Sequence, residues 1–291
     1  MESRLTTTVA SAGQLRDDTL SIALEVRMGT WRPEADSGPA IEVAAFAEAG
    51  KAPQVPGPLI RVKEGTTIAA TIRNALPDST ISIFGLLSQA AGLKDSLTLR
   101  PGEARQVRFT ATAAGTYFYR AVLGKHTPDR HVNDEREQVA GALIVDPPGP
   151  VAPDRIFAIN IWGSRVDSAV YRPIDYRNAI TINGRSWPYT DRIEATTGDT
   201  VRLRVINLSG RTHPMHLHGF YYQVLSRGDG VSDTVYRGRR PAHGRHRGDA
   251  ALHHDGDELR AKSSRQLALS LSRRLSRRAA VPAQQGGGWQ S

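Results

Sequence analysis

The feature that most constrains the fold of this chain is a segment that occurs twice. The stretch "IRVKEGTTIAATIRN" (Ile60–Asn74) aligns without gaps with "IEATTGDTVRLRVIN" (Ile193–Asn207), so that Asn74 matches Asn207. Each copy places a glycine where a turn is expected, followed by alternating apolar residues that end at the asparagine, which is typical of a half-buried strand. The repeat therefore predicts two related β-sandwich domains in tandem. Two unrelated strands of similar composition are the alternative.

Short apolar alternations between Gly, Pro and Asp turns fill most of the chain before residue 237 and predict an all-β fold. The chain has no apolar run long enough for a transmembrane helix, and its first residues contain no readable secretory signal. The proline-rich "DPPGPVAPD" is typical of a linker. We expect an N-terminal extension over 1–19, a first domain over 20–147, a linker over 148–154, a second, incomplete domain over 155–236 and a tail over 237–291.

Three histidines follow the second repeat copy, in "RTHPMHLHGF". His216 and His218 are two residues apart, so on an extended strand their imidazoles face the same side. His213 lies three residues before His216 and points to the other side, next to Pro214, which fixes the local backbone. This pattern predicts two neighbouring metal sites, and imidazole suits copper, zinc, iron and nickel alike. A solvent-facing histidine cluster or an unrelated zinc site is the alternative.

The segment "HPMHLHG" resembles the third copper motif of the multicopper oxidases, the family that includes laccases. The stretches "PGPLIRV", "GTYFY" and "GALIVDPP" resemble landmarks of the first domain of that family, and "GDTVRLRVIN" resembles one of its last domain. The resemblance implies tandem cupredoxin-like (plastocyanin-like) Greek-key β-sandwiches with copper as the cofactor. It also implies that His213 binds a mononuclear blue copper, while His216 and His218 bind a trinuclear cluster that passes electrons from a small reducing substrate to dioxygen.

The first domain departs from the family pattern at the four positions where histidines of the trinuclear cluster are expected. Alignment of "SIFGL" with the "HLHG" of the second copy places Ser82 and Phe84 at two of them, and Arg120 and Val122 follow "GTYFY" at the other two. None of these side chains replaces a neutral imidazole on copper. The sequence therefore predicts that one chain builds no standard trinuclear site. A cluster between subunits, in a homo-oligomer or another assembly, requires a partner that supplies the missing imidazoles.

The segment 237–291 carries most of the net charge of +9 and shows no strand alternation, which predicts disorder. The chain has no cysteine, although the family expects a cysteine–histidine segment here. Arg265–Ser272, "RQLALSLS", permits the codons CGG CAA CTG GCT CTT TCA CTG TCA. Shifted by one nucleotide, and completed by the C that begins a CGN codon of Arg273, they encode "GNWLFHCH". An out-of-frame tail is therefore predicted. A disordered basic tail with non-specific attraction to nucleic acid or anionic membranes is the alternative, and no specific nucleic-acid partner is expected.

These observations predict a multicopper-oxidase-like copper-binding protein whose own oxidase activity is absent or impaired. The alternative is a degenerate cupredoxin module that binds copper or transfers electrons without reducing oxygen. A chain without any metal function, from a broken gene, is the third reading. The resemblance implies a periplasmic or secreted protein.

Overall fold

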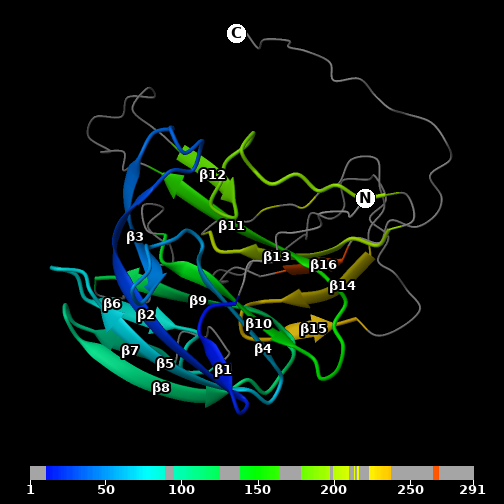
Figure 1. The fold of residues 1–291 in the computed structure, drawn as a ribbon, viewed down its shortest axis with the longest axis horizontal. Helices are drawn as coiled ribbons and strands as arrows, with labels where there is room; N and C mark the ends of the chain where they lie inside the picture. Colours follow the sequence, from blue (N-terminus) through cyan, green and yellow to red (C-terminus); the bar gives the residue numbers. More distant parts are fainter. Residues whose placement is uncertain are drawn as a thin grey trace, which may run out of the picture.

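The computed structural model describes residues 11–88, 95–124, 138–163, 178–196, 199–209, 213, 215 and 223–236, together with the backbone of 265–268. The described residues form strands, turns and loops, with no helix and so none that is able to span a membrane. The predicted all-β fold is confirmed for this part of the chain. Figure 1 shows the strands of the first domain in the lower left and those of the second domain above and to the right.

The first domain is a sandwich of two sheets. The first sheet contains β1 (Gln14–Arg16), β2 (Thr19–Trp31), β3 (Ile41–Glu48), β5 (Thr67–Asn74) and β8 (Ala104–Thr110). The second has the order β4 (Gly57–Lys63), β10 (Ala140–Asp146), β9 (Gly115–Leu123), β6 (Ile81–Phe84) and β7 (Ser96–Leu99). Because β1 pairs with β2, the expectation of an extension over all of 1–19 is wrong, and the domain begins before residue 20.

Apolar side chains that alternate along these strands fill the space between the two sheets. Ile68 and Ile72 of β5 face Ile81 and Ile83 of β6, and all four are fully buried in one cluster. Tyr119 of the "GTYFY" segment lies in the same core, and its hydroxyl donates to the carbonyl of Pro58 at 2.6 Å. Burial raises the pKa of this tyrosine well above its ordinary value, so the hydroxyl stays a donor.

The second domain contributes one sheet of six strands to the described structure. Their order is β12 (Asn178–Ile182), β11 (Arg155–Gly163), β13 (Arg202–Asn207), β16 (Arg265–Ala268), β14 (Gln223–Gly228) and β15 (Asp233–Val235). Strand β16 pairs antiparallel with both β13 and β14, in the interior of the sheet. The prediction of disorder over 237–291 is therefore wrong for 265–268, and the rest of that tail lies outside the described residues.

The sequence repeat corresponds to a repeat in structure. In the first copy β5 runs parallel to β2, with Thr19 opposite Thr67. In the second copy β13 runs parallel to β11, with Arg155 opposite Leu203. Both copies therefore pair in parallel with a strand near the start of their domain. This shared pairing favours two related domains over two strands that merely have similar composition.

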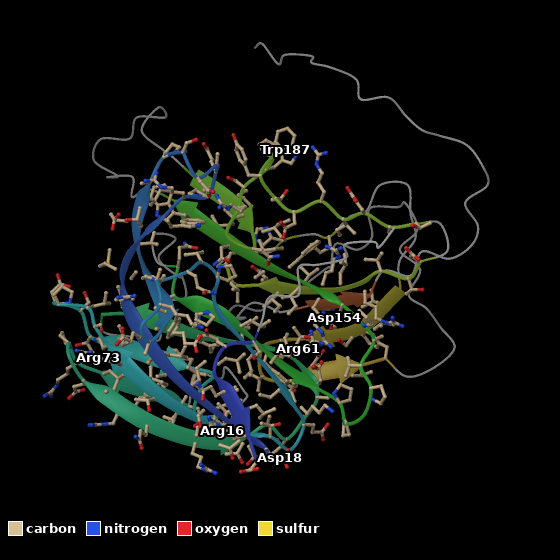
Figure 2. All side chains as sticks on the ribbon, in the orientation of Figure 1. Arg16, Asp18, Arg61, Arg73, Asp154 and Trp187 are labelled. Carbon is tan, nitrogen blue, oxygen red and sulfur yellow. The ribbon has the colours of Figure 1, made fainter. Side chains whose placement is uncertain are left out.

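Two arginines and two aspartates form a network where the domains meet, which we call the interdomain network. Figure 2 labels two of its members, Arg61 and Asp154. Arg61 of β4 donates to Asp146 and to Asp154, each at 2.7 Å, and Arg204 of β13 donates to Asp154 at 2.5 Å and to Asp146 at 3.4 Å. Arg204 also donates to the hydroxyl of Thr116 on β9 at 2.9 Å. Each aspartate thus bridges a cation from each domain, so the network ties the second sheet of the first domain to the sheet of the second.

An apolar contact continues the same interface. Phe118 of β9 and Ile144 of β10 belong to one buried cluster with Ala158 of β11 and Ile206 of β13. Phe118 and Ile144 lie on the face of the second sheet that is turned away from the core of the first domain, and Ala158 and Ile206 meet them from the sheet of the second domain. Burying them removes apolar surface from water and leaves little freedom for the domains to move apart.

Removal of one aspartate should expose the contribution of the interdomain network. Burial by itself raises the pKa of Asp154, but hydrogen bonds from Arg61 and Arg204 outweigh it and hold that pKa below the ordinary value of 3.8. Asp154→Asn should lower the free energy of unfolding by about 2–3 kcal/mol at neutral pH, because hydrogen bonds to charged groups contribute on this scale. Urea unfolding measures the change.

The sign of the pH dependence follows from the lowered pKa. The carboxylate of Asp154 stabilises the fold above the ordinary pKa of 3.8, and this contribution disappears as the pH falls through the folded-state value. The difference between the wild type and Asp154→Asn should therefore shrink in acid. Asp36→Asn is the control, since Asp36 pairs with Arg185 but its side chain is 91% exposed. An equal loss of stability in both variants would contradict the role of the network.

Candidate functional site

The four first-domain positions where ligand histidines are expected lie together on one face of a sheet. Strands β6 and β9 are antiparallel, with Ser82 opposite Val122 and Phe84 opposite Arg120. Side chains two residues apart on a strand share a face, so the two pairs stand next to each other. The intervening residues Ile83 and Ala121 point into the core of the first domain. The four side chains therefore lie on the opposite face, the one that carries Phe118 toward the second domain.

The chemistry of these four side chains, which we call the β6–β9 patch, differs from that of a metal site. The guanidinium carbon of Arg120 lies 5.2 Å from the centroid of the Phe84 ring, and the ring is fully buried. A cation at this distance from an aromatic face is stabilised by the ring quadrupole. Burial lowers the pKa of Arg120 from its ordinary value, although arginine stays charged in proteins. Ser82 Oγ lies 3.4 Å from the hydroxyl of Thr98.

The second-domain site begins where β13 ends at Asn207. Ser209 is buried, and its Oγ lies 2.8 Å from Nε2 of His213. Met215 packs with Ile159 and Val205, so its side chain lies against the sheet of the second domain. The predicted ligands His216 and His218 lie outside the described residues. Among the described residues, no group of three or more histidines, cysteines and acids is placed to hold a metal ion.

Sequence reasoning missed the contact of Ser209 with His213, although a signal for it was present. The repeat aligns Ser209 with Leu76, which is buried in the core of the first domain. A buried serine at the position of a buried leucine requires a hydrogen-bonding partner. His213 is such a partner, and it occurs only in the second copy.

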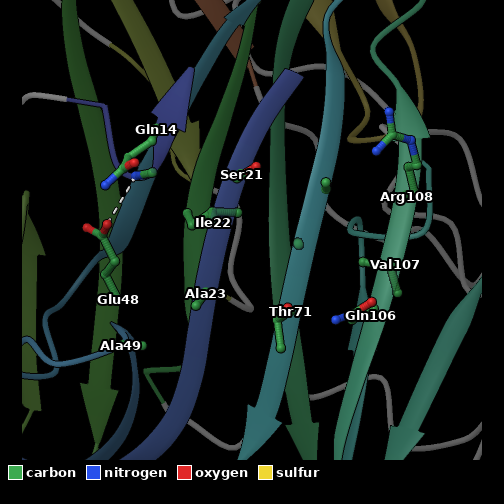
Figure 3. A pocket seen from close by; sticks show the side chains of 13 residues that line it. Gln14, Ser21, Ile22, Ala23, Glu48, Ala49, Thr71, Gln106, Val107 and Arg108 are labelled. Carbon is green, nitrogen blue, oxygen red and sulfur yellow. Dashed lines mark hydrogen bonds between the residues drawn. The ribbon is translucent and has the colours of Figure 1, made fainter. Parts of the chain in front are cut away.

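A groove of about 560 Å³ lies on the outer face of the first sheet, away from both sets of residues (Figure 3). Its floor consists of small side chains such as Ser21, Ala23 and Thr71. Glu48 at its edge accepts hydrogen bonds from Lys51 and from the amide of Gly13, and the lysine is the main cause of its lowered pKa. The lining includes no histidine, so this groove is not a candidate for a copper centre.

Two family models match this chain. A model described as multicopper oxidase matches residues 48–150, and a second model with the same description matches residues 164–250. Together they span more than half of the chain, one in each domain. The chain belongs to the multicopper oxidase family. The family resemblance seen in the sequence is thereby confirmed, and copper is the cofactor that membership implies.

Two curated proteins of different kinds are similar in sequence to this chain. A probable nitrite reductase–hydroxylamine oxidoreductase fusion protein of Kuenenia stuttgartiensis is 26% identical over 239 residues, which cover 76% of this chain and 27% of that protein. Laccase-25 of Oryza sativa subsp. japonica is 27% identical over 191 residues, which cover 55% of this chain and 31% of that protein. The chain thus spans less than a third of the length of these curated relatives.

Solved structures confirm the fold. The blue copper oxidase from Nitrosomonas europaea has a TM-score of 0.59 and 23% identity, and the match covers 87% of this chain and 76% of that one. The copper nitrite reductase from Nitrosomonas europaea has a TM-score of 0.53 and 17% identity, with 87% and 85% covered. The predicted cupredoxin-like fold is therefore confirmed.

The fit of copper to this multicopper oxidase chain differs between its two domains. In the second, His213 supplies an imidazole whose Nε2 is already held by a hydroxyl, an arrangement common for metal ligands. In the first, the β6–β9 patch offers a guanidinium, a phenyl ring, a hydroxyl and an aliphatic group, which do not fit a copper cluster. The sequence also contains no cysteine, so the thiolate of a blue-copper site is missing.

The contact between Phe84 and Arg120 makes a testable contribution to stability. In a double-mutant cycle with Phe84→Leu and Arg120→Met, we expect a coupling of about 1 kcal/mol, because a partly desolvated cation–π pair contributes about 0.5–2 kcal/mol. Urea unfolding of the four proteins gives the value. The control cycle pairs Arg120→Met with Phe109→Leu on β8, where no coupling is expected. Equal coupling in both cycles would show that the ring and the guanidinium do not interact specifically.

Proposed function

We propose that this chain is a copper-binding member of the multicopper oxidase family that holds copper in its second domain and does not reduce dioxygen alone. His213, His216 and His218 are the proposed ligands. The β6–β9 register carries the proposal, because it brings the four first-domain positions together without a single imidazole among them. Bound copper would supply one-electron redox chemistry with a small reducing substrate.

A homo-oligomer does not remove this deficiency. Each copy brings the same Ser82, Phe84, Arg120 and Val122, so no arrangement of identical chains supplies the missing first-domain imidazoles at these positions. Completion of an oxygen-reducing cluster would need a different protein that contributes those histidines. The family activity, in which electrons from a reducing substrate reach dioxygen, therefore belongs to such an assembly and not to this chain.

A second candidate function is electron transfer through a blue copper. The position of β16 supports this function for the protein that the neighbouring reading frame would encode, and not for the chain with the present sequence. The backbone of Arg265–Ala268 pairs between β13 and β14. These residues open the segment for which the neighbouring reading frame permits "GNWLFHCH". We infer that the in-frame product places a cysteine and a histidine on or next to this strand. The nucleotide sequence across Arg265–Ser272 decides the point, since a neighbouring frame without a cysteine codon between histidine codons would exclude it.

Copper binding tests the ligand assignment. Titration of the metal-free chain with cupric ion should show saturable binding, and His213→Gln should weaken it about tenfold or more, because a directly coordinating imidazole is lost. His126→Gln is the matched control, since it makes the same change at a histidine outside the cluster. Isothermal titration calorimetry measures both. Unchanged affinity in the His213, His216 and His218 variants would overturn the assignment.

Oxygen consumption tests the second half of the proposal. The copper-loaded chain, supplied with a phenolic reductant, should consume dioxygen no faster than the same concentration of free copper. The missing first-domain imidazoles are the physical reason. An oxygen electrode gives the rate, and sustained catalytic consumption by the purified chain would refute the proposal.

A further inference from the structure

The end of strand β13 contains a short chain of hydrogen bonds that leads to His213. The side-chain oxygen Oδ1 of Asn207 accepts the backbone N–H of Ser209 at 3.0 Å. A backbone N–H only donates, so this contact establishes which end of the Asn207 amide faces Ser209. It is the oxygen, an acceptor without a hydrogen of its own.

The hydroxyl of Ser209 stands between this oxygen and the histidine. Ser209 Oγ lies 2.7 Å from Oδ1 of Asn207 and 2.8 Å from Nε2 of His213. The hydroxyl has one hydrogen, and Asn207 Oδ1 needs it because two oxygens at this distance require a donor. Ser209 Oγ must then accept from His213, so Nε2 carries the hydrogen. A neutral imidazole has one N–H, and its lone pair is therefore on Nδ1.

We propose that Asn207 and Ser209 are positioning residues that fix His213 as the Nε2–H tautomer and so direct Nδ1 to the metal. The inference rests on the proposed function in taking His213 as a copper ligand. A ring nitrogen binds a metal through its lone pair, and the partner of the other nitrogen decides which one is available. The buried hydroxyl of Ser209 also fixes the plane of the ring, which reduces the reorganisation that binding requires.

We call the hydrogen-bonded chain from Asn207 through Ser209 to His213 the relay, and the first repeat copy lacks it. Asn74 makes the corresponding turn, with its Oδ1 accepting the N–H of Leu76 at 3.1 Å. Leu76 occupies the position of Ser209 and has no hydroxyl, and the amide of Asn74 donates to the carbonyls of Ser79 and Leu99 instead. The asparagine turn is thus common to both domains, whereas the serine occurs only in the domain with the histidine. The asparagine turn therefore forms without a hydroxyl at this position, which favours a role of the Ser209 hydroxyl toward His213.

Nitrogen NMR of the metal-free full chain tests the relay without copper. Under conditions where the imidazole is neutral, the ¹⁵N shifts of His213 should report the Nε2–H tautomer, with His213→Gln identifying the resonances. Ser209→Ala should convert His213 to a mixture of tautomers, and Ser209→Thr, which keeps the hydroxyl, should restore the original one. Ser226→Ala is the matched control, because it removes another buried serine hydroxyl in the same domain. His213 in the Nδ1–H form in the wild type would overturn the proposal.

Copper affinity then connects the relay to the site. Ser209→Ala should weaken copper binding about tenfold, in the range typical for loss of a hydrogen bond to a metal ligand, while Ser226→Ala should not. These experiments distinguish a failure of the ligand assignment from a failure of the relay. If the chain binds no copper but His213 has the Nε2–H tautomer, the ligand assignment fails and the relay stands. If copper binds through His213 but Ser209→Ala changes neither tautomer nor affinity, the relay fails and the ligand assignment stands.

Discussion

The interdomain network is the interaction on which the arrangement of the molecule depends. Asp146 and Asp154 each lie between Arg61 of the first domain and Arg204 of the second. Buried charges are costly unless they are paired, so a pair that opened would leave an uncompensated charge in a poorly solvated place. Closure of the network therefore favours one relative position of the two sheets, and the adjacent apolar cluster adds to it. The network determines which side chains of the two domains approach each other.

The interdomain network also links the strand that leads to the proposed copper ligand His213 with a strand of the β6–β9 patch. Arg204 lies on β13, the strand that ends at Asn207 and leads to His213. Its partner Thr116 lies on β9, the strand that carries Arg120 and Val122 toward its other end. The strand with the proposed ligand relay is thus tied to a strand that offers Arg120 and Val122 where the family resemblance expects imidazoles. Both domains have the parallel strand pair and the asparagine turn, so at these positions the contrast between them is chemical.

Much of this structure follows from the sequence, and the exceptions have physical causes. Alternation of apolar residues and the repeat from Ile60 and Ile193 were enough to predict tandem β-domains, because burial depends on periodicity. The family motifs indicated that Ser82 and Val122 stand where ligand histidines are expected, and the register of β6 with β9 then placed them opposite each other. The interdomain network could not be predicted from the sequence, because Arg61 and Asp154 are distant in sequence and resemble ordinary surface charges. Only the fold brings them together. Strand β16 was missed because Arg265–Ala268 has no alternating pattern, and its place between β13 and β14 is seen only in the structure.

The central claim is that copper has a place at His213 and none beside β6 and β9. A crystal structure of the copper-loaded chain, with anomalous diffraction data collected at the copper absorption edge, tests both parts at once. The account predicts an anomalous peak within bonding distance of His213 and no peak next to Ser82, Phe84, Arg120 and Val122. A copper peak at the β6–β9 patch, or well-ordered copper elsewhere with His213 unliganded, would contradict it.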